Sequence, residues 1–444
     1  MKINMPPDAC RIIDRLREGG FDAYAVGGCV RDSLLGVTPN DWDICTAATP
    51  SDVKRCLAGS RIIDTGLRHG TVTVVADEGH YEITTFRTEG AYSDCRRPDS
   101  VEFVSSVIDD LARRDFTVNA MAYNESAGLV DPFGGEKSLR ENVIACVGDP
   151  DERFKEDALR ILRALRFSSA YGFKIEDKTS EAVRKNKDLL KRISAERIYA
   201  ELKKLLTGRD VLRVLLDYPD VLSAVIPEIA PCVGFCQKSR YHIYDVWEHT
   251  AHSVDNAVND PAVRLAMLFH DMAKPLCFFE DEKGEGHFYG HASKSAELAE
   301  KALRRLKAPV KEKELIRKMI RAHDNDMLPS RKSVRRWLAL FGEKEFFALL
   351  EVKKADELSK NGGSVRSRDA EESGRIALSL LESEPRFSET SLGINGEDIK
   401  ALGAEGKEIG RIKKELWELV IDEECENRRK ELLRRASLML RKRG

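Results

Sequence analysis

Two aspartates separated by one residue lie near the start of the chain, in the segment Asp41-Trp-Asp43. In an extended segment, residues two apart point to the same face, so both carboxylates can reach one pair of metal ions. Hard carboxylate oxygens are the ligands that two-metal phosphoryl transfer requires. Taken alone, however, such a triplet is also typical of a polar turn.

Residue types suited to phosphate and nucleotide binding flank this pair of acids. Glycines such as Gly27 and Gly28 let backbone N–H groups approach phosphate oxygens, and Arg31 can add a bidentate contact. Further along, the run from Arg113 to Met121 joins two adjacent cations to an acid and an amide. This combination favours a nucleotide site, and the alternative is a capped helix start with exposed arginines.

A second acid–base pair occurs in the segment Glu156-Asp157-Ala-Leu-Arg160, where apolar residues recur at helical spacing. Residues three apart on a helix are neighbours. We therefore expect Asp157 to accept from an exocyclic amine while Arg160 donates to a ring N3 or O2, imitating a complementary base edge. The alternative is a surface ion pair.

Histidines are concentrated in the second half of the chain, where seven of the nine lie in one stretch. They are His242, His249, His252, His270, His287, His291 and His323. His270-Asp271 follows an apolar helical run, and Asp356 lies further along. Imidazole and carboxylate ligands suit a divalent transition metal such as Mn²⁺ or Ni²⁺, whose bound water can attack a phosphoester.

Local patterns predict the elements that position these residues. A helix is expected over 8–19, a strand over 21–26, and a hairpin from runs 71–75 and 81–86. After residue 135 the apolar spacing becomes helical almost throughout, and 361–364 resembles a linker. From residue 153 to 213, 17 Lys and Arg accompany nine acids, which predicts either a basic face or a solvated helical surface.

Composition limits the class of protein. The 444 residues carry a formal net charge of −2, 42% hydrophobic and 33% charged residues, which describes a folded chain of several domains. Ten scattered cysteines indicate a reducing compartment, and the sequence contains neither a signal-like segment nor a long apolar stretch. We therefore predict a cytoplasmic protein without membrane association, and no protein partner is inferred.

The order of the first motifs resembles the class II tRNA nucleotidyltransferases, or CCA-adding enzymes, of the polymerase β superfamily. The resemblance rests on Gly27 to Gly36 with Asp41-Trp-Asp-Ile44, on Arg113 to Met121, and on the Glu-Asp-X-X-Arg motif at residue 156. It implies that three carboxylates bind catalytic Mg²⁺, namely Asp41, Asp43 and Glu82. It also implies nucleotide binding by Gly27, Gly28, Arg31, Arg114, Asp115, Asn119, Asp157, Arg160 and Arg163.

The histidine-rich region resembles the HD phosphohydrolase superfamily through a tetrad of metal ligands. These ligands are His249, His270, Asp271 and Asp356. His291 and His323 lie where two-metal members of that superfamily place additional histidines. Some CCA-adding enzymes are similar in combining such a domain with the head, which implies a second, phosphohydrolase activity on RNA 3′ ends or cyclic phosphates.

Together these features predict an α+β fold with an N-terminal nucleotidyltransferase head of mixed sheet and helices, followed by largely all-α parts. The predicted parts are a head (1–138), a helical neck that reads the base and binds RNA (139–220), an HD-type metal-binding domain (221–360) and a helical tail (361–444). The tail either contacts RNA or is a packing helix.

The predicted activity is addition of CCA to tRNA from CTP and ATP. Two alternatives stay open: a bacterial poly(A) polymerase, and an HD phosphohydrolase with a non-catalytic RNA-binding head. The segment Gly66-Leu-Arg-His-Gly-Thr-Val-Thr73 is similar to the CCA-adding pattern rather than that of the polymerase. The undeleted loop 87–98 indicates complete CCA addition rather than addition of CC alone.

Overall fold

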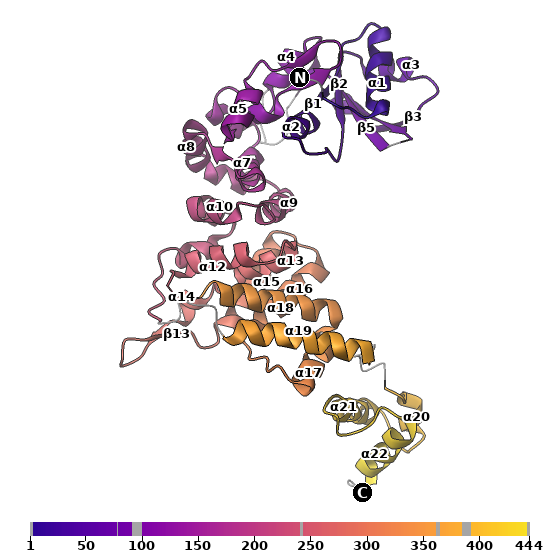
Figure 1. The fold of residues 1–444 in the computed structure, drawn as a ribbon, viewed down its shortest axis with the longest axis vertical. Helices are drawn as coiled ribbons and strands as arrows, with labels where there is room; N and C mark the ends of the chain where they lie inside the picture. The colour runs from indigo at the N-terminus through magenta and orange to yellow at the C-terminus, as the bar shows by residue number, and fades with distance from the viewer. Residues whose placement is uncertain are drawn as a thin grey trace. The chain divides into compact units, whose positions relative to one another are not determined.

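The computed structural model describes residues 3–77, 79–90, 100–239, 243–360, 365–383 and 392–441. The chain divides into two compact units, Met1–Ala230 and Pro231–Gly444. Figure 1 shows sheet structure concentrated in the first unit and helices throughout the second. The predicted combination of a mixed-sheet head with helical parts is confirmed, whereas the four-part division stays a prediction.

The head is built on a seven-stranded mixed sheet in the order β3-β4-β5-β2-β1-β8-β9. Strands β2 and β5 are parallel, and the other neighbours are antiparallel. The strands are β1 (Ala23–Val26), β2 (Asp43–Thr46), β3 (Arg61–Gly66), β4 (Thr71–Ala76), β5 (Gly79–Thr85), β8 (Ala122–Asn124) and β9 (Gly128–Val130). The pairing of β4 with β5 confirms the predicted hairpin.

Helices and short strands surround this sheet. They are α1 (Pro7–Glu18), α2 (Gly28–Leu34), α3 (Pro50–Cys56), η1 (Leu67–His69), β6 (Arg87–Glu89), β7 (Val101–Phe103), α4 (Val107–Ala112), η2 (Thr117–Asn119) and α5 (Gly135–Glu141). Helix α3 begins where the sequence dictates, because Thr49 and Asp52 form a capping box and Pro50 occupies the first turn. The core joins Tyr24 and Phe86 to buried aliphatic side chains.

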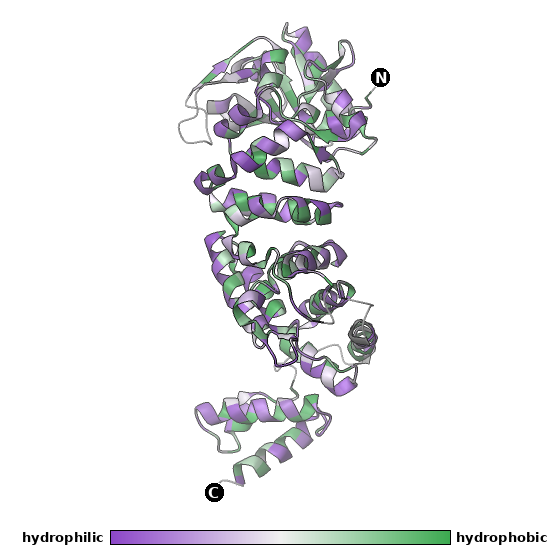
Figure 2. Ribbon diagram, turned by 90° about the vertical axis from the view of Figure 1, so that its left-hand side faces the viewer, coloured by the Kyte–Doolittle hydropathy of each residue, from purple (hydrophilic) through white to green (hydrophobic). Residues whose placement is uncertain are grey.

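The rest of the first unit is a stack of helices with one two-stranded parallel sheet. Its elements are β10 (Val143–Ile144), α6 (Pro150–Glu156), α7 (Leu159–Tyr171), β11 (Lys174–Ile175), α8 (Asp177–Lys185), η3 (Lys187–Arg192), α9 (Ala195–Leu206), α10 (Val211–Asp217) and α11 (Pro219–Val225). Helix α7 packs against α9 and α10. Hydrophobic and hydrophilic residues are interleaved along these helices (Figure 2), as expected of helices with one buried face.

The second unit is helical except for one small hairpin. Its elements are η4 (Pro227–Cys232), α12 (Val246–Asn256), α13 (Pro261–Phe269), α14 (Lys274–Cys277), β12 (Phe279–Glu280), β13 (Gly286–His287), α15 (His291–Arg305), α16 (Val310–Ala322), α17 (Arg331–Phe341), α18 (Glu343–Leu358), α19 (Val365–Ser383), α20 (Gly396–Lys400), α21 (Lys407–Ile421) and α22 (Arg429–Arg441). Helix α13 is almost wholly apolar and is the central, buried helix, in contact with α12, α15, α16 and α18.

The last three helices enclose a small core of their own, which includes Ile399, Ile412 and Leu432. Arg336 of α17 donates to Asp422 at the end of α21 in a bidentate pair of 2.6 and 2.7 Å. The tail is therefore a packed element, and its predicted contact with RNA stays a prediction. No described helix is both long and apolar enough to span a membrane.

Candidate active sites

The sheet register brings the predicted head carboxylates onto neighbouring strands. Asp43 opens β2 and lies opposite Glu82 of β5 in the parallel pair, and Asp41 precedes it by two residues. Trp42 is buried, whereas Asp41, Asp43 and Glu82 are exposed. This alternation is the one expected of an extended segment.

The electrostatics of this group suit a cation. Partial desolvation by the surrounding protein raises the pKa of Asp43. The neighbouring carboxylates of Glu82 and Asp41 raise this pKa further, whereas Arg114 lowers it. Like charges held together favour either a proton or a metal ion, and the donors are all hard oxygens. The residues therefore fit Mg²⁺.

Arg114 approaches this region from the segment after α4. Its guanidinium lies near Gly27, where an added Cβ would come within 2.7 Å of Nη1. Gly27 has φ +80°, and this backbone conformation is what requires glycine there. The buried carboxylate of Asp110 holds Arg113 at 2.8 Å and Arg114 at 3.3 Å. Sequence reasoning missed Asp110, although its i,i+3 and i,i+4 spacing to the two arginines was a usable signal.

Asp115 joins the head to helix α7. Its Oδ1 accepts from Asn119 Nδ2 at 3.0 Å, and its Oδ2 accepts from Arg163 at 2.8 Å (Nε) and 2.6 Å (Nη2). Burial alone would raise the pKa of this carboxyl, but Arg163 and Asn119 hold it at about 2. Asp115, Asn119 and Arg163, three predicted nucleotide-binding residues, therefore form one hydrogen-bonded network in which Asp115 is ionised.

Arg31 belongs to the same network and is buried. It donates to Asn119 Oδ1 at 2.5 Å and pairs with Asp32 at 2.9 Å. Its guanidinium carbon lies 4.8 Å from the ring centroid of Tyr171 and 5.3 Å from that of Phe167. In this structure Arg31 connects α2 to α7, and its predicted contact with phosphate stays a prediction.

The expected arrangement of Asp157 and Arg160 on one helix is wrong. Helix α6 ends at Glu156, and Asp157 has an extended backbone (φ −134°, ψ 101°) before α7 begins at Leu159. The short polar side chain of Asp157 accepts from the backbone N–H of Leu159, which competes with helix continuation.

Each member of this predicted pair has a different partner. Asp157 Oδ2 accepts from Arg197 Nη2 at 2.6 Å, and Arg160 donates to Glu156 and to the carbonyl oxygen of Arg113. Both side chains nevertheless lie beside the end of α6, within the same unit as the head carboxylates. Their selection of the base stays a prediction.

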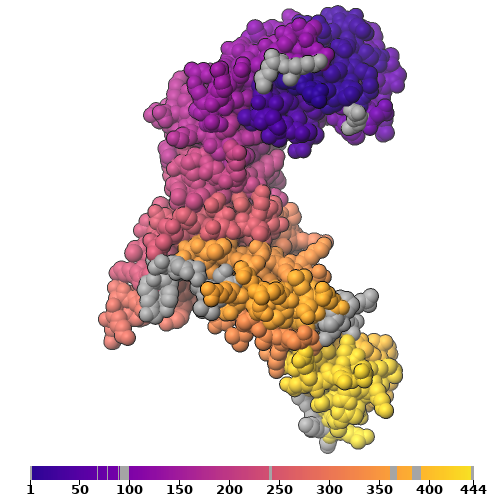
Figure 3. Space-filling model, in the orientation of Figure 1, coloured from indigo at the N-terminus to yellow at the C-terminus, as the bar shows by residue number. Residues whose placement is uncertain are grey.

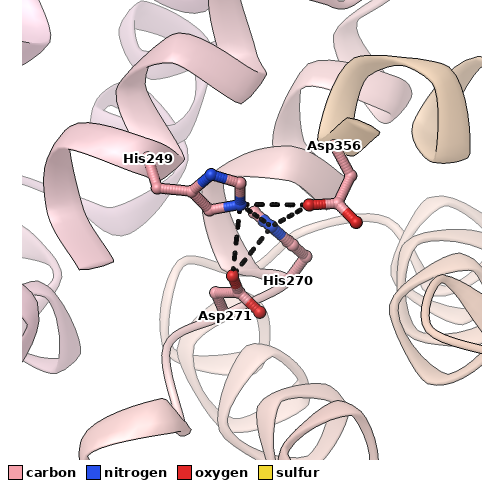
Figure 4. Close-up of side chains that lie close together, drawn as sticks. All are labelled: His249, His270, Asp271 and Asp356. Carbon is pink, nitrogen blue, oxygen red and sulfur yellow. Dashed lines mark hydrogen bonds and ion pairs between the residues drawn. The ribbon is translucent and has the colours of Figure 1, made fainter. Parts of the chain in front are cut away.

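The second unit brings together all six predicted metal ligands in its interior. His249, His270, Asp271 and Asp356 form one group, and Asp271, His291 and His323 form another, with ligand atoms in each group within 4.8 Å of one another. Figure 4 shows the first four side chains converging from separate parts of the chain. Among the described residues, no such group of three or more occurs in the head.

Distances within the cluster match side chains arranged around cations. His249 Nε2 lies 3.0 Å from Asp356 Oδ1 and 3.4 Å from Asp271 Oδ2, and His270 Nε2 lies 3.2 Å from Asp271 Oδ2. On the other side of Asp271, Oδ1 lies 3.2 Å from His291 Nε2. Asp271 therefore bridges the two groups through different oxygens.

Backbone carbonyls orient the four imidazoles. The Nδ1 atoms of His270, His291 and His323 lie 2.6, 2.9 and 2.7 Å from the carbonyl oxygens three residues earlier, and His249 Nδ1 lies 3.4 Å from Ser359 O. These contacts leave every Nε2 facing the carboxylates, which is the orientation that a metal site needs.

Acidic and basic side chains shift one another's pKa within the cluster. Burial opposes a charge on His270, but Asp271 and Asp356 raise its pKa to about 9. Both carboxylates have pKa values well below the usual range despite burial, Asp271 because of His270 and Lys274, and Asp356 because of Lys360 and His249. Because ligating imidazoles are neutral, a divalent metal held by these residues would displace a proton from His270.

Several features of the sites were not predicted from sequence. Lys274 and Lys360 flank the cluster, with Nζ atoms 2.6 Å from Asp271 Oδ2 and 2.7 Å from Asp356 Oδ2. Their i,i+3 and i,i+4 spacing to the ligands was the available signal. The predicted loop 87–98 lies largely outside the described residues, as does His242.

Comparisons with known families cover most of the chain in three segments. Residues 23–145 match a family described as "Poly A polymerase head domain", and residues 172–232 match "Probable RNA and SrmB- binding site of polymerase A". Residues 240–361 match "HD domain".

The chain is also similar to curated and structurally solved CCA-adding enzymes. The chain is 48% identical over 220 residues to the CCA-adding enzyme of Ligilactobacillus salivarius and 47% identical over 228 residues to that of Geobacillus stearothermophilus. These matches cover 49% and 51% of this chain, and 54% and 56% of the relatives, so the alignments span about half of the relatives' length.

The solved structure of the Bacillus stearothermophilus CCA-adding enzyme in complex with CTP matches over 99% of both chains, with a TM-score of 0.75 and 30% identity. The Thermotoga maritima CCA-adding enzyme complexed with tRNA matches with a TM-score of 0.58 and 21% identity, over 98% of this chain and 96% of that one. The second likeness concerns the fold alone.

Proposed function

We propose that this chain, which belongs to the family of CCA-adding enzymes, adds C, C and A to the 3′ end of tRNA with CTP and ATP as donors. The observation that carries the proposal is the register of the sheet, which sets Asp43 opposite Glu82 with Asp41 two residues away. The proposed substrates also favour a cytoplasmic location.

In the proposed reaction, the 3′ oxygen of tRNA bonds to the α-phosphorus of the nucleoside triphosphate. The bond from that phosphorus to the bridging oxygen breaks, pyrophosphate leaves, and the hydroxyl proton passes to solvent. Asp41, Asp43 and Glu82 hold the divalent cations, which when bound lower the pKa of the attacking hydroxyl and neutralise the leaving group.

The arginines and amides position the nucleotide in this proposal. Arg114, oriented by Asp110, contacts the triphosphate, and the network of Asp115 and Asn119 faces the ribose. Asp157 and Arg160 read the base, with Arg197 fixing the direction of Asp157. The basic side chains of residues 153–213 contact the tRNA backbone.

Incorporation on tRNA transcripts that lack CCA tests this function. With CTP and ATP the proposal predicts growth by three residues, and with CTP alone growth by two. Long tails of A from ATP alone would support a poly(A) polymerase instead. The absence of any incorporation would support the non-catalytic head.

The buried cluster of the second unit supports a second activity, hydrolysis of a phosphate ester at an RNA 3′ end or of a cyclic phosphate. Its six ligands fit two divalent cations, each of which when bound supplies an activated water. The water oxygen adds to phosphorus, the bond from phosphorus to a ribose oxygen breaks, and that oxygen takes the proton. Such hydrolysis exposes the hydroxyl that nucleotide addition needs.

A further inference from the structure

An exposed aromatic side chain lies beside the buried cluster, in a segment that sequence reasoning did not assign to any site. Tyr289 follows the β12–β13 hairpin and is 77% exposed. Figures 1 and 3 show the hairpin projecting from the surface of the second unit. The exposed ring is accessible to a ligand, and its position beside the cluster is what singles it out from the other exposed apolar side chains of this unit.

The Tyr289 ring has an aromatic neighbour on one side. The His287 ring stacks parallel to it, with ring centroids 5.5 Å apart and an interplanar angle of 4°. His287 is itself fixed, because its Nε2 lies 2.9 Å from Asp281 Oδ2. One face of Tyr289 is therefore supported by a second ring, and the exposed side chain offers an aromatic surface to a flat ligand.

This aromatic pair and the metal ligands share one pocket of about 300 Å³. Its lining includes His287 and Tyr289 together with Asp271, His291 and Asp356. Tyr289 is two residues from His291, so their Cα atoms are at most about 7 Å apart, within the span of one nucleotide.

The inner end of the same pocket suits an anion once cations are bound. Lys274 and Lys360 both line it, and each Nζ lies against a carboxylate ligand of the cluster. Lys274 also donates to Gln237 Oε1 at 2.8 Å and lies over the ring of Phe288, which fixes its position. A phosphate fits this end, and a planar, weakly polar group fits the other.

We infer that Tyr289, supported by His287, is a stacking platform for the nucleobase of a ligand whose phosphate reaches the buried cluster. The inference rests on the proposed hydrolysis and adds one specificity-determining residue to that site: Tyr289 favours ligands that carry a nucleobase over base-free phosphate esters. A stacking contact does not distinguish one base from another, because every base has an aromatic face. The platform therefore accepts any 3′-terminal nucleotide.

Equilibrium binding tests the platform without relying on catalysis. Adenosine 2′-monophosphate and the base-free glycerol 2-phosphate are titrated by calorimetry into the full chain loaded with Mn²⁺. We expect Tyr289→Ala to weaken binding of the adenosine ligand about tenfold, the size of one base–aromatic stack, and to leave glycerol 2-phosphate unchanged. Tyr289→Phe keeps the ring and is expected to bind as the wild type does.

Leu276→Ala is the matched control, because Leu276 is 63% exposed in the same unit but does not line the pocket. Equal adenosine binding by the wild type and Tyr289→Ala would overturn the inference, and so would equal loss of both ligands. Absence of adenosine binding by the wild type would overturn it as well.

Hydrolysis kinetics separate this inference from the proposed function. With adenosine 2′,3′-cyclic phosphate, Tyr289→Ala is expected to raise KM about tenfold with kcat nearly unchanged. With glycerol 1,2-cyclic phosphate neither constant changes. If the loaded wild type hydrolyses neither compound, the proposed hydrolysis fails, while the binding experiment still decides whether Tyr289 stacks on a base.

Discussion

The two candidate metal sites of this chain are built in opposite ways. In the head, Asp43 and Glu82 are exposed on neighbouring strands with Asp41 just before the first of them, and they form no compact group of three ligands, whereas in the second unit six buried side chains converge. A buried cluster whose imidazoles are already oriented holds its cations as part of the fold. An open set of carboxylates binds metal together with the substrate's phosphates. We therefore expect resident metal in the second unit and exchangeable metal in the head.

The largest expected effect is on nucleotide addition. Asp41→Ala or Asp43→Ala is predicted to reduce addition of both C and A by about 10³-fold or more, because each removes a ligand worth several kcal/mol of transition-state stabilisation. Single-turnover rates on tRNA lacking CCA measure the loss, with tRNA binding checked separately.

Asp77→Ala is the control for this loss, because it removes another exposed head carboxylate, located in the turn between β4 and β5. Near-normal incorporation in either metal-ligand variant would refute the assignment of the head carboxylates.

The next effect concerns metal content. Because Asp271 bridges both groups of ligands, Asp271→Ala is predicted to lose both equivalents of resident metal, whereas His323→Ala loses one. Elemental analysis of protein loaded with Mn²⁺ and then desalted measures the content. His252→Ala is the control, since that histidine stacks on Tyr244 outside the cluster. Equal losses in Asp271→Ala and His323→Ala would contradict the shared-ligand arrangement.

A smaller effect is expected on base selection in the head. Asp157→Ala and Arg160→Ala are predicted to let UTP or GTP enter about tenfold more often relative to CTP and ATP, the scale of one lost base-edge contact. Arg197→Ala is expected to do the same more weakly, because it only positions Asp157. Competition assays with all four nucleotides measure selectivity. Slower addition with unchanged selectivity would argue against base reading by this pair.

The smallest effect is on stability and depends on pH. Asp115 has a pKa of about 2 in the folded chain, below the ordinary value of 3.8, so its ionised form stabilises the fold above about pH 4. Asp115→Asn is predicted to cost about 2 kcal/mol at pH 7. That deficit shrinks below about pH 4 and vanishes near pH 2. Urea unfolding at pH 7 and pH 3 measures both values, and an equal deficit at both would contradict the ion pair with Arg163.

The sequence predicted the elements that have a local pattern and missed a helix break that depends on one side chain. Alternation predicted the β4–β5 hairpin and apolar periodicity predicted the buried α13, because both are local signals. Clustered histidines indicated a metal site, whereas the set of six side chains that the structure brings together came from the resemblance to the HD superfamily. The break at Asp157 was not predicted, since a side chain that caps the next helix overrides helical spacing.

Side-chain contacts between residues far apart in the chain could not be predicted from the sequence either. The pairing of Asp157 with Arg197 and the contact of Arg31 with Tyr171 join residues far apart in the chain. Nothing in local spacing encodes such contacts, which arise only when α2, α7 and α9 pack. The same holds for the pocket that Tyr289 shares with the cluster.

We expect the chain to carry two metal centres with separate tasks, of which the head alone extends tRNA. Sequencing the 3′ ends of a tRNA transcript lacking CCA, after incubation with CTP, ATP and Mg²⁺, tests it most directly. We expect complete CCA ends from the wild type and from Asp271→Ala, and unextended ends from Asp43→Ala. Loss of addition in Asp271→Ala equal to that in Asp43→Ala, or ends other than CCA from the wild type, would contradict it.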